Sequence, residues 1–209
     1  MSPEPQDDHA PDHDHGLRDR LVRVGVELVA RSGTEALSLR EIARRAGVSH
    51  GAPRRHFPTH QALLAAIAME GYHDLGRRIA ERVTGARPAE PYARLLVLGR
   101  LYLDFARSNP GMFALMFRHD LLRGNGIGLR EASQPLFGVL VDLVARARPP
   151  AADGTSPAVV AGALWANWHG IAQLWQWGSL QTTVRTDDVE PLLRATLTAH
   201  VGPPPAHPN

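Results

Sequence analysis

The side chains best suited to binding a charged partner lie together in a short part of the sequence. Arg54, Arg55 and His56 follow one another directly, and Arg40 precedes them. A guanidinium group presents a planar fork of N–H donors that fits phosphate oxygens and the major-groove edge of guanine. These residue types therefore indicate contact with DNA, in which arginines neutralise phosphates or read bases.

Charge is unevenly distributed along the 209 residues, although the formal net charge is only +2. All 23 basic residues are arginine. Residues 1–16 hold five acidic residues and no arginine, which gives −5. Residues 17–60 hold nine arginines and four acidic residues (+5), and residues 61–209 hold 14 and 12 (+2). Positive charge is thus concentrated where phosphate neutralisation needs it.

Two short helices joined by a turn are predicted to position the arginine cluster. Ser38 is a good N-cap, and Glu41 stands three residues later, as in a capping box. Gly47 tolerates the left-handed geometry of a helix C-terminus. Val48 is expected to be buried in the turn, and Ser49 to cap the second helix. This layout is a helix-turn-helix, whose second helix enters the DNA major groove.

The rest of the sequence shows helical periodicity and no convincing strand, so we expect an all-α fold of about nine helices. Residues 1–16 are predicted to be a disordered acidic, histidine-rich tail, and residues 202–209 a second disordered tail. Residues 17–60 should form a three-helix domain that begins with a helix over 17–32. Residues 61–201 should form a second helical domain. Its expected helices include 61–85, which connects the two domains, and 129–147, 157–180 and 187–201.

Several classes of protein are disfavoured by what the sequence lacks. It contains no cysteine, so disulfides and thiolate metal sites are excluded. No apolar run reaches the roughly 18 residues that a membrane span needs, and the acidic N-terminus does not resemble a signal peptide. A cytoplasmic protein without membrane contact, cofactor, metal or catalytic residues is the resulting expectation.

The segment from Gly33 to Leu64 resembles the tetracycline-repressor (TetR) family. The matching residues are Gly33, Ser38, Ile42-Ala43, Ala46-Gly47-Val48-Ser49, Phe57 and Leu63-Leu64, all in register. Further along, Trp168-His169-Gly170 resembles the Trp-His-Gly signature of one group of the family's C-terminal domains, and the residues 109–113 suit that group. The resemblance implies a homodimeric transcriptional repressor that binds a palindromic, double-stranded operator and is released by a small hydrophobic effector.

The same resemblance assigns roles to individual residues. The predicted DNA-binding set is Ser38, Arg40, Ser49, His50, Gly51, Ala52, Arg54, Arg55, His56 and His60. Three residues depart from the family's usual pattern. Pro53 stands where the family usually has Leu or Ile, Arg54 where it usually has Tyr, and His60 where it usually has Lys. Proline should be tolerated in the first helical turn. Arg54 is expected to bind a phosphate or a guanine edge, and a neutral His60 to weaken a phosphate contact.

The helix predicted over 157–180 has two different faces. Large aromatic side chains lie on one arc, and small residues that allow close helix packing lie on the other. We hypothesise that the small face meets a partner subunit and that the aromatic face lines an effector cavity or forms core. The dimer-interface candidates are Gly162, Ala163, Ala166, Gly170, Leu193 and Leu197. The effector-pocket candidates are Tyr102, Phe105, Met112, Phe113, Met116, Phe117, Trp165, Trp168, His169 and Trp175.

Other interpretations of individual motifs remain open. Gly47-Val-Ser-His-Gly51 matches the G-x-S-x-G elbow of hydrolases, although a helix rather than a strand is expected before Ser49. A helical effector-binding or interaction module without specific DNA binding is the main alternative. His169 is either a hydrogen-bonded core residue or a ligand. Arg44 and Arg45 either contact phosphates or lie on a solvated face. In the N-terminal tail, His9, His13 and His15 either bind a metal or are solvated. The acidic residues of the same tail could compete with DNA phosphates for the positively charged residues 17–60.

Overall fold

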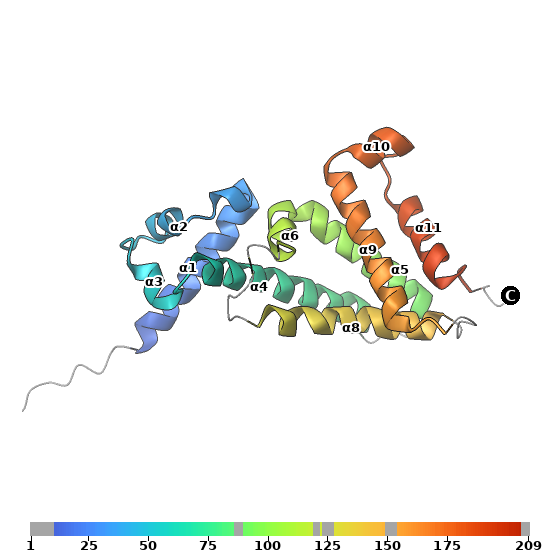
Figure 1. The fold of residues 1–209 in the computed structure, drawn as a ribbon, viewed down its shortest axis with the longest axis horizontal. Helices are drawn as coiled ribbons and strands as arrows, with labels where there is room; N and C mark the ends of the chain where they lie inside the picture. Colours follow the sequence, from blue (N-terminus) through green and yellow to red (C-terminus); the bar gives the residue numbers. More distant parts are fainter. Residues whose placement is uncertain (1–10, 86–89, 119–121, 123–127, 149–153, 206–209) are drawn as a thin grey trace, which may run out of the picture. The chain divides into compact units, whose positions relative to one another are not determined.

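The structure is a computed structural model that describes residues 11–85, 90–118, 122, 128–148 and 154–205. These residues form ten α-helices and no strand, which confirms the all-α prediction (Figure 1). No described helix is long and apolar enough to span a membrane. The helices are α1 (Pro11–Ser32), α2 (Leu39–Arg45), α3 (Ala52–His56), α4 (His60–Ile79), α5 (Pro91–Ser108), α6 (Pro110–Met116), α8 (Leu129–Ala147), α9 (Pro157–Gln176), α10 (Ser179–Val184) and α11 (Glu190–Val201).

Several helix boundaries differ from the sequence prediction. Helix α1 begins at Pro11, so residues 11–16 are helical rather than disordered; proline is favoured in a first helical turn. Residues 1–10, which carry His9, lie outside the described residues. The connecting helix is α-helical only to Ile79 and continues as a π-helical turn over Ala80–Thr84. Helix α9 ends at Gln176 because Gly178 adopts a left-handed conformation (φ +73°), and the unpredicted α10 follows.

The chain divides into two compact units that do not coincide with the predicted domains. One contains the described residues within Met1–Gly71 and Gly111–Ile127, and the other those within Tyr72–Pro110 and Gly128–Asn209. Helix α6 belongs to the first unit because it packs on α4 and α1. A Cβ atom at Gly71 would lie 2.6 Å from the Met116 sulfur, and one at Gly111 would lie 2.3 Å from the Val29 carbonyl oxygen.

The core of the first unit fixes α1, α2, α3 and the start of α4 together. The side chains of Leu21, Ile42, Phe57 and Ile67 are at most 1% exposed. The Arg18 guanidinium lies 5.3 Å from the centroid of the Phe57 ring, which is a cation–π contact between α1 and the end of α3. The short helix α3 is therefore anchored on a buried support.

The second unit is organised around α5, which packs against α8, α9 and α11 (Figure 1). Gly99 makes the close packing possible, since a Cβ there would lie 2.5 Å from Leu193 Cδ1 and 3.0 Å from Trp168 Cζ2. Leu193 and Leu197 are fully buried in this core. Their prediction as dimer-interface residues was therefore wrong, because the apolar side of α11 faces its own subunit.

Candidate functional site

Helix α2 begins with a side-chain cap at the predicted residue. The Ser38 hydroxyl accepts a hydrogen bond from the Glu41 amide at 3.2 Å. The amide of Ser38 itself donates to the Ala36 carbonyl (2.9 Å), so the reciprocal half of the capping box is not made. The Glu41 carboxylate is consequently available to other partners.

The turn between α2 and α3 has the hydrogen bonds of a Schellman motif. Gly47, with φ +68°, donates from its amide to the Arg44 carbonyl (3.2 Å), and Val48 donates to the Ala43 carbonyl (3.0 Å). Gly47 thus ends the helix as predicted. Val48 is half-buried, which corrects the expectation of a buried residue in the turn.

Helix α3 begins at Ala52, and its N-cap is Gly51 rather than Ser49. An N-cap at Ser49 would require the amide of residue 53 to donate to the Ser49 carbonyl, and Pro53 has no N–H. The Ser49 carbonyl instead accepts from Ala52 (3.1 Å) in a preceding turn. Ser49 also follows a helix, so the strand–serine–helix arrangement of a hydrolase elbow is not formed there.

Helix α3 buries one side and exposes the other. Pro53 and Phe57 are buried, whereas Arg54 and Arg55 are exposed. Among the other predicted DNA-binding residues, Ser38, Arg40, Ser49, His50 and Gly51 are exposed, and Ala52, His56 and His60 are half-buried. The tolerance for proline in the first turn is confirmed.

Five residues from α2, the turn after it and α3 line one open hollow of about 670 Å³. Four of them, Arg40, His50, Gly51 and Arg54, belong to the predicted DNA-binding set. The fifth, Leu39, is not in that set. It is half-buried, and an apolar side chain in this place can contact a thymine methyl group.

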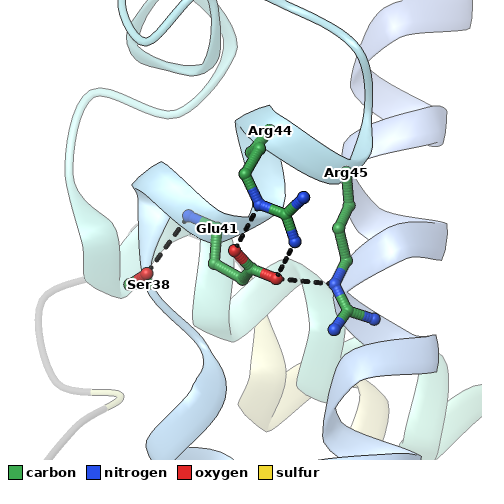
Figure 2. A network of polar contacts seen from close by, with 4 residues as sticks. All are labelled: Ser38, Glu41, Arg44 and Arg45. Atoms are coloured by element: carbon green, nitrogen blue, oxygen red, sulfur yellow. Dashed lines mark hydrogen bonds and ion pairs between the residues drawn. The ribbon is translucent and has the colours of Figure 1, made fainter.

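Positive charge on the helix-turn-helix falls into two classes, as Figure 2 shows for the paired class. Arg44 donates to both oxygens of the Glu41 carboxylate (Nε–Oε2 2.8 Å, Nη2–Oε1 2.7 Å), and Arg45 Nε donates to Oε1 at 2.7 Å. Hydrogen bonds from Arg44 and then Arg45 lower the pKa of Glu41 to about 2. Arg54 and Arg55, by contrast, form no ion pair with any residue that the structure describes.

His60 forms a hydrogen bond inside the three-helix domain. Its Nε2 atom is 2.5 Å from the Leu37 carbonyl oxygen, so the ring donates there and joins the start of α4 to the segment before α2. The half-buried imidazole is therefore engaged in the protein's own structure. The predicted contact between His60 and a DNA phosphate would have to use the other ring nitrogen, Nδ1.

A second cluster of polar aromatic side chains lies in the second unit. Trp165 Nε1 donates to the Tyr102 hydroxyl (3.1 Å), and that hydroxyl lies 2.9 Å from His169 Nδ1. Burial raises the pKa of Tyr102 and lowers that of His169, so both are neutral near pH 7. Phe137 from α8 packs edge-on against Trp165 (centroids 6.2 Å apart).

The structure divides the predicted pocket residues between the two units. Met112, Phe113, Met116 and Phe117 lie in the first unit with α1 and α4. In the second unit, Trp168 is 1% exposed, while Trp165 is 37% exposed. Packing between helices far apart in the sequence determines which unit each of these residues joins, and the spacing of apolar residues carries no information about such packing. The pocket candidates in the second unit are Tyr102, Phe105, Trp165, Trp168, His169 and Trp175.

An apolar stripe runs along one side of α9 and onto its C-cap residue Trp177; its members are exposed except Gly170, which is half-buried. It includes three of the predicted dimer-interface residues, and Gly162 lies beside it. A Cβ atom at Gly162 or Gly170 would meet nothing within 4 Å. The large members Val159 and Trp177 are 63% and 70% exposed. We call this set the α9 stripe: Val159, Ala163, Ala166, Gly170, Leu174 and Trp177.

A three-helix domain with a capped second helix, whose last helix exposes arginines that pair with no acidic residue in the described part of the chain, defines a helix-turn-helix DNA-binding protein. Comparison with known proteins specifies the family. Residues 21–67 match the bacterial regulatory proteins, tetR family, and residues 95–200 match the tetracyclin repressor-like C-terminal domain. The second match alone covers half of the chain. The chain therefore belongs to the TetR family of transcriptional regulators, which confirms the resemblance.

Individual relatives agree with this assignment. The uncharacterised HTH-type regulator YerO of Bacillus subtilis is 28% identical over 60% of this chain and 42% of its own length. The HTH-type transcriptional repressor Rv3405c of Mycobacterium tuberculosis is 33% identical over 40% and 45%. The chain thus spans about half the length of these curated relatives. A solved structure from Rhodococcus sp. RHA1, of unknown function, is 29% identical, with a TM-score of 0.73 over 94% of this chain and 97% of that one.

Proposed function

We propose that this regulator is a homodimeric repressor that binds a palindromic operator through α3 and leaves it when a small, uncharged hydrophobic effector binds the second unit. The observation that carries DNA binding is the two-sided character of α3. Pro53 and Phe57 anchor the helix, while Arg54 and Arg55 are exposed and pair with no acidic residue that the structure describes. Such cations can neutralise phosphates or bind guanine.

The α9 stripe supports the homodimer. An exposed apolar stripe at helical spacing is expensive for a lone subunit in water, and its small central residues permit a close helix approach. A second copy of the chain presents the same stripe, so the two can meet about a twofold axis. Two α3 helices related by that axis would reach successive major grooves, one DNA turn or a multiple apart.

The cluster of Tyr102, Trp165 and His169 supports an effector site in the second unit. Its members are neutral aromatic groups joined by hydrogen bonds, and no charged side chain is buried among the described residues. An uncharged ligand with a flat apolar body is the kind of molecule that such side chains bind. Replacing Tyr102→Phe removes the hydroxyl that joins Trp165 Nε1 and His169 Nδ1, and should weaken the effector response while leaving DNA binding in the absence of effector intact.

The effector acts by favouring one of two arrangements of the dimer. It can shift that equilibrium only by its differential affinity for them, typically about 1–3 kcal/mol. Helix α4 begins in the first unit and ends in the second, so it is a covalent element suited to carry the change.

A gel-shift titration with the DNA upstream of the chain's own coding sequence, repeated at several salt concentrations, tests the proposal. Sequence-specific binding whose affinity falls steeply as the salt concentration rises supports operator binding. A protein that retards no DNA would instead be an interaction module. Turnover of ester probes without DNA binding would favour a hydrolase.

A further inference from the structure

We propose that Glu41 is a specificity-determining residue, because its carboxylate keeps Arg44 and Arg45 from neutralising DNA phosphates and so limits affinity for DNA of arbitrary sequence. This inference rests on the proposed operator binding. It concerns the arginines that the predicted DNA-binding set left out, and it assigns a function to the network drawn in Figure 2.

The geometry places Arg44 where a phosphate could otherwise bind it. Arg40 borders the hollow between α2 and α3, and Arg44 lies one helical turn further along the same side of α2. The side chain of Arg44 is 66% exposed. Exposure alone would therefore make this guanidinium a phosphate ligand, as expected for Arg40.

The carboxylate engages both arginines at once. Arg44 forms a two-pronged pair with Glu41, and Arg45 shares one of the same oxygens. Charge-assisted pairs of this kind are about twice as strong as neutral hydrogen bonds. Because hydrogen bonds from both arginines hold the pKa of Glu41 near 2, the carboxylate stays ionised throughout the physiological pH range. The three residues present a net charge of +1 instead of the +2 of two free arginines.

The consequence differs between operator and random DNA. Affinity for random DNA comes almost entirely from the number of phosphates neutralised, whereas base contacts add to operator affinity. Holding two arginines in an internal pair therefore lowers random binding and leaves the contacts of Arg40, His50 and Arg54 unchanged. The ratio of operator to random affinity rises as a result.

The test is a salt titration of full-length protein with a random-sequence duplex, followed by fluorescence anisotropy. Each phosphate newly neutralised steepens the slope of log affinity against log salt by about 0.9. Glu41→Gln should therefore steepen it by about 0.9 to 1.8, which at the upper limit makes the loss over a fourfold salt increase about 12-fold larger than in wild type. A slope equal to that of the wild type overturns the proposal.

Asp74 provides a matched control, since it pairs with Arg77 and Arg78 at the same i+3 and i+4 spacing in the second unit (2.5 and 2.8 Å). Asp74→Asn makes the same change in net charge and should leave the slope unaltered. An equal increase in both variants would show a general charge effect and refute the role of Glu41.

Combined substitutions separate the arginines from any disturbance of α2. The triple variant Glu41→Gln, Arg44→Gln, Arg45→Gln should return the slope to the wild-type value, and a slope that stays steep overturns the proposal. If Glu41→Gln does not fold, the double variant Arg44→Gln, Arg45→Gln should keep the wild-type slope, and a marked decrease contradicts the inference. Wild-type protein that binds no duplex at low salt refutes DNA binding itself, which distinguishes that failure from a failure of Glu41 alone.

Discussion

Replacement of Gly170 by leucine tests the proposed dimer contact without disturbing the fold of the subunit. Gly170 is a central member of the α9 stripe, and a Cβ atom there meets nothing within 4 Å in the single subunit. Leucine should also favour the helix by roughly 1 kcal/mol relative to glycine. The variant subunit is therefore expected to fold with unchanged or slightly higher stability.

The dimer should respond in the opposite direction. A twofold interface receives the new side chain twice, and each overpacked side chain costs about 1–3 kcal/mol. The total of about 2–6 kcal/mol corresponds to a dissociation constant weaker by about 30-fold to about 10⁴-fold, at 1.4 kcal/mol per factor of ten. Sedimentation velocity across a dilution series measures this change, and circular dichroism melting reports the fold.

Gly138 supplies the matched control. It lies in α8, is exposed, and likewise has nothing within 4 Å of an added Cβ. Gly138→Leu should leave the dimer intact. If Gly170→Leu gives the same mass distribution as Gly138→Leu and the wild type, α9 does not form the interface and the reasoning from its exposed stripe fails.

Three further predictions follow from individual contacts. Arg54→Ala should weaken operator binding by about 1–3 kcal/mol if its fork reads a base, as a competition titration against wild type would show; equal affinities would exclude that role. Because burial lowers the pKa of His169, the folded state favours the neutral imidazole, and its contribution to stability is present above the unfolded pKa of about 6.5 and declines as pH falls below it. Melting temperatures should therefore drop between about pH 7.5 and 5.5 more steeply in wild type than in His169→Asn, and parallel pH profiles would contradict this assignment. Gly111→Ala brings a Cβ to 2.3 Å from the Val29 carbonyl oxygen, a backbone atom that no rotamer change can move, so the urea midpoint should fall by the equivalent of about 1–3 kcal/mol; an unchanged midpoint would show that α6 shifts freely.

Features set by local chemistry were predictable from the sequence. Ser38 caps α2 and Gly47 ends it because both roles depend on neighbouring backbone groups only. Helix α8 spans Leu129–Ala147, the range that its apolar spacing predicted. The pairs from Glu41 to Arg44 and Arg45 follow the i+3 and i+4 rule and were open to the same reasoning.

Features set by distant packing were not predictable in this way. The spacing of Leu193 and Leu197 identifies a buried helix face, but it does not say whether the same subunit or a partner subunit covers that face. Met112 and Met116 have the spacing of a pocket wall, yet they pack on Gly71 in the first unit. The cap at Ser49 failed for a local reason that the sequence did contain, since Pro53 lacks the amide that such a cap requires.

We propose that the exposed face of α3, duplicated by a twofold axis, binds DNA. Hydroxyl-radical footprinting on the chain's own upstream DNA tests it most directly. We expect two protected half-sites related by dyad symmetry, with centres one DNA turn of about 10.5 base pairs apart or a small multiple of it, and their loss in Arg54→Ala. A single unsymmetrical protected segment, or protection that Arg54→Ala leaves unchanged, would contradict the claim.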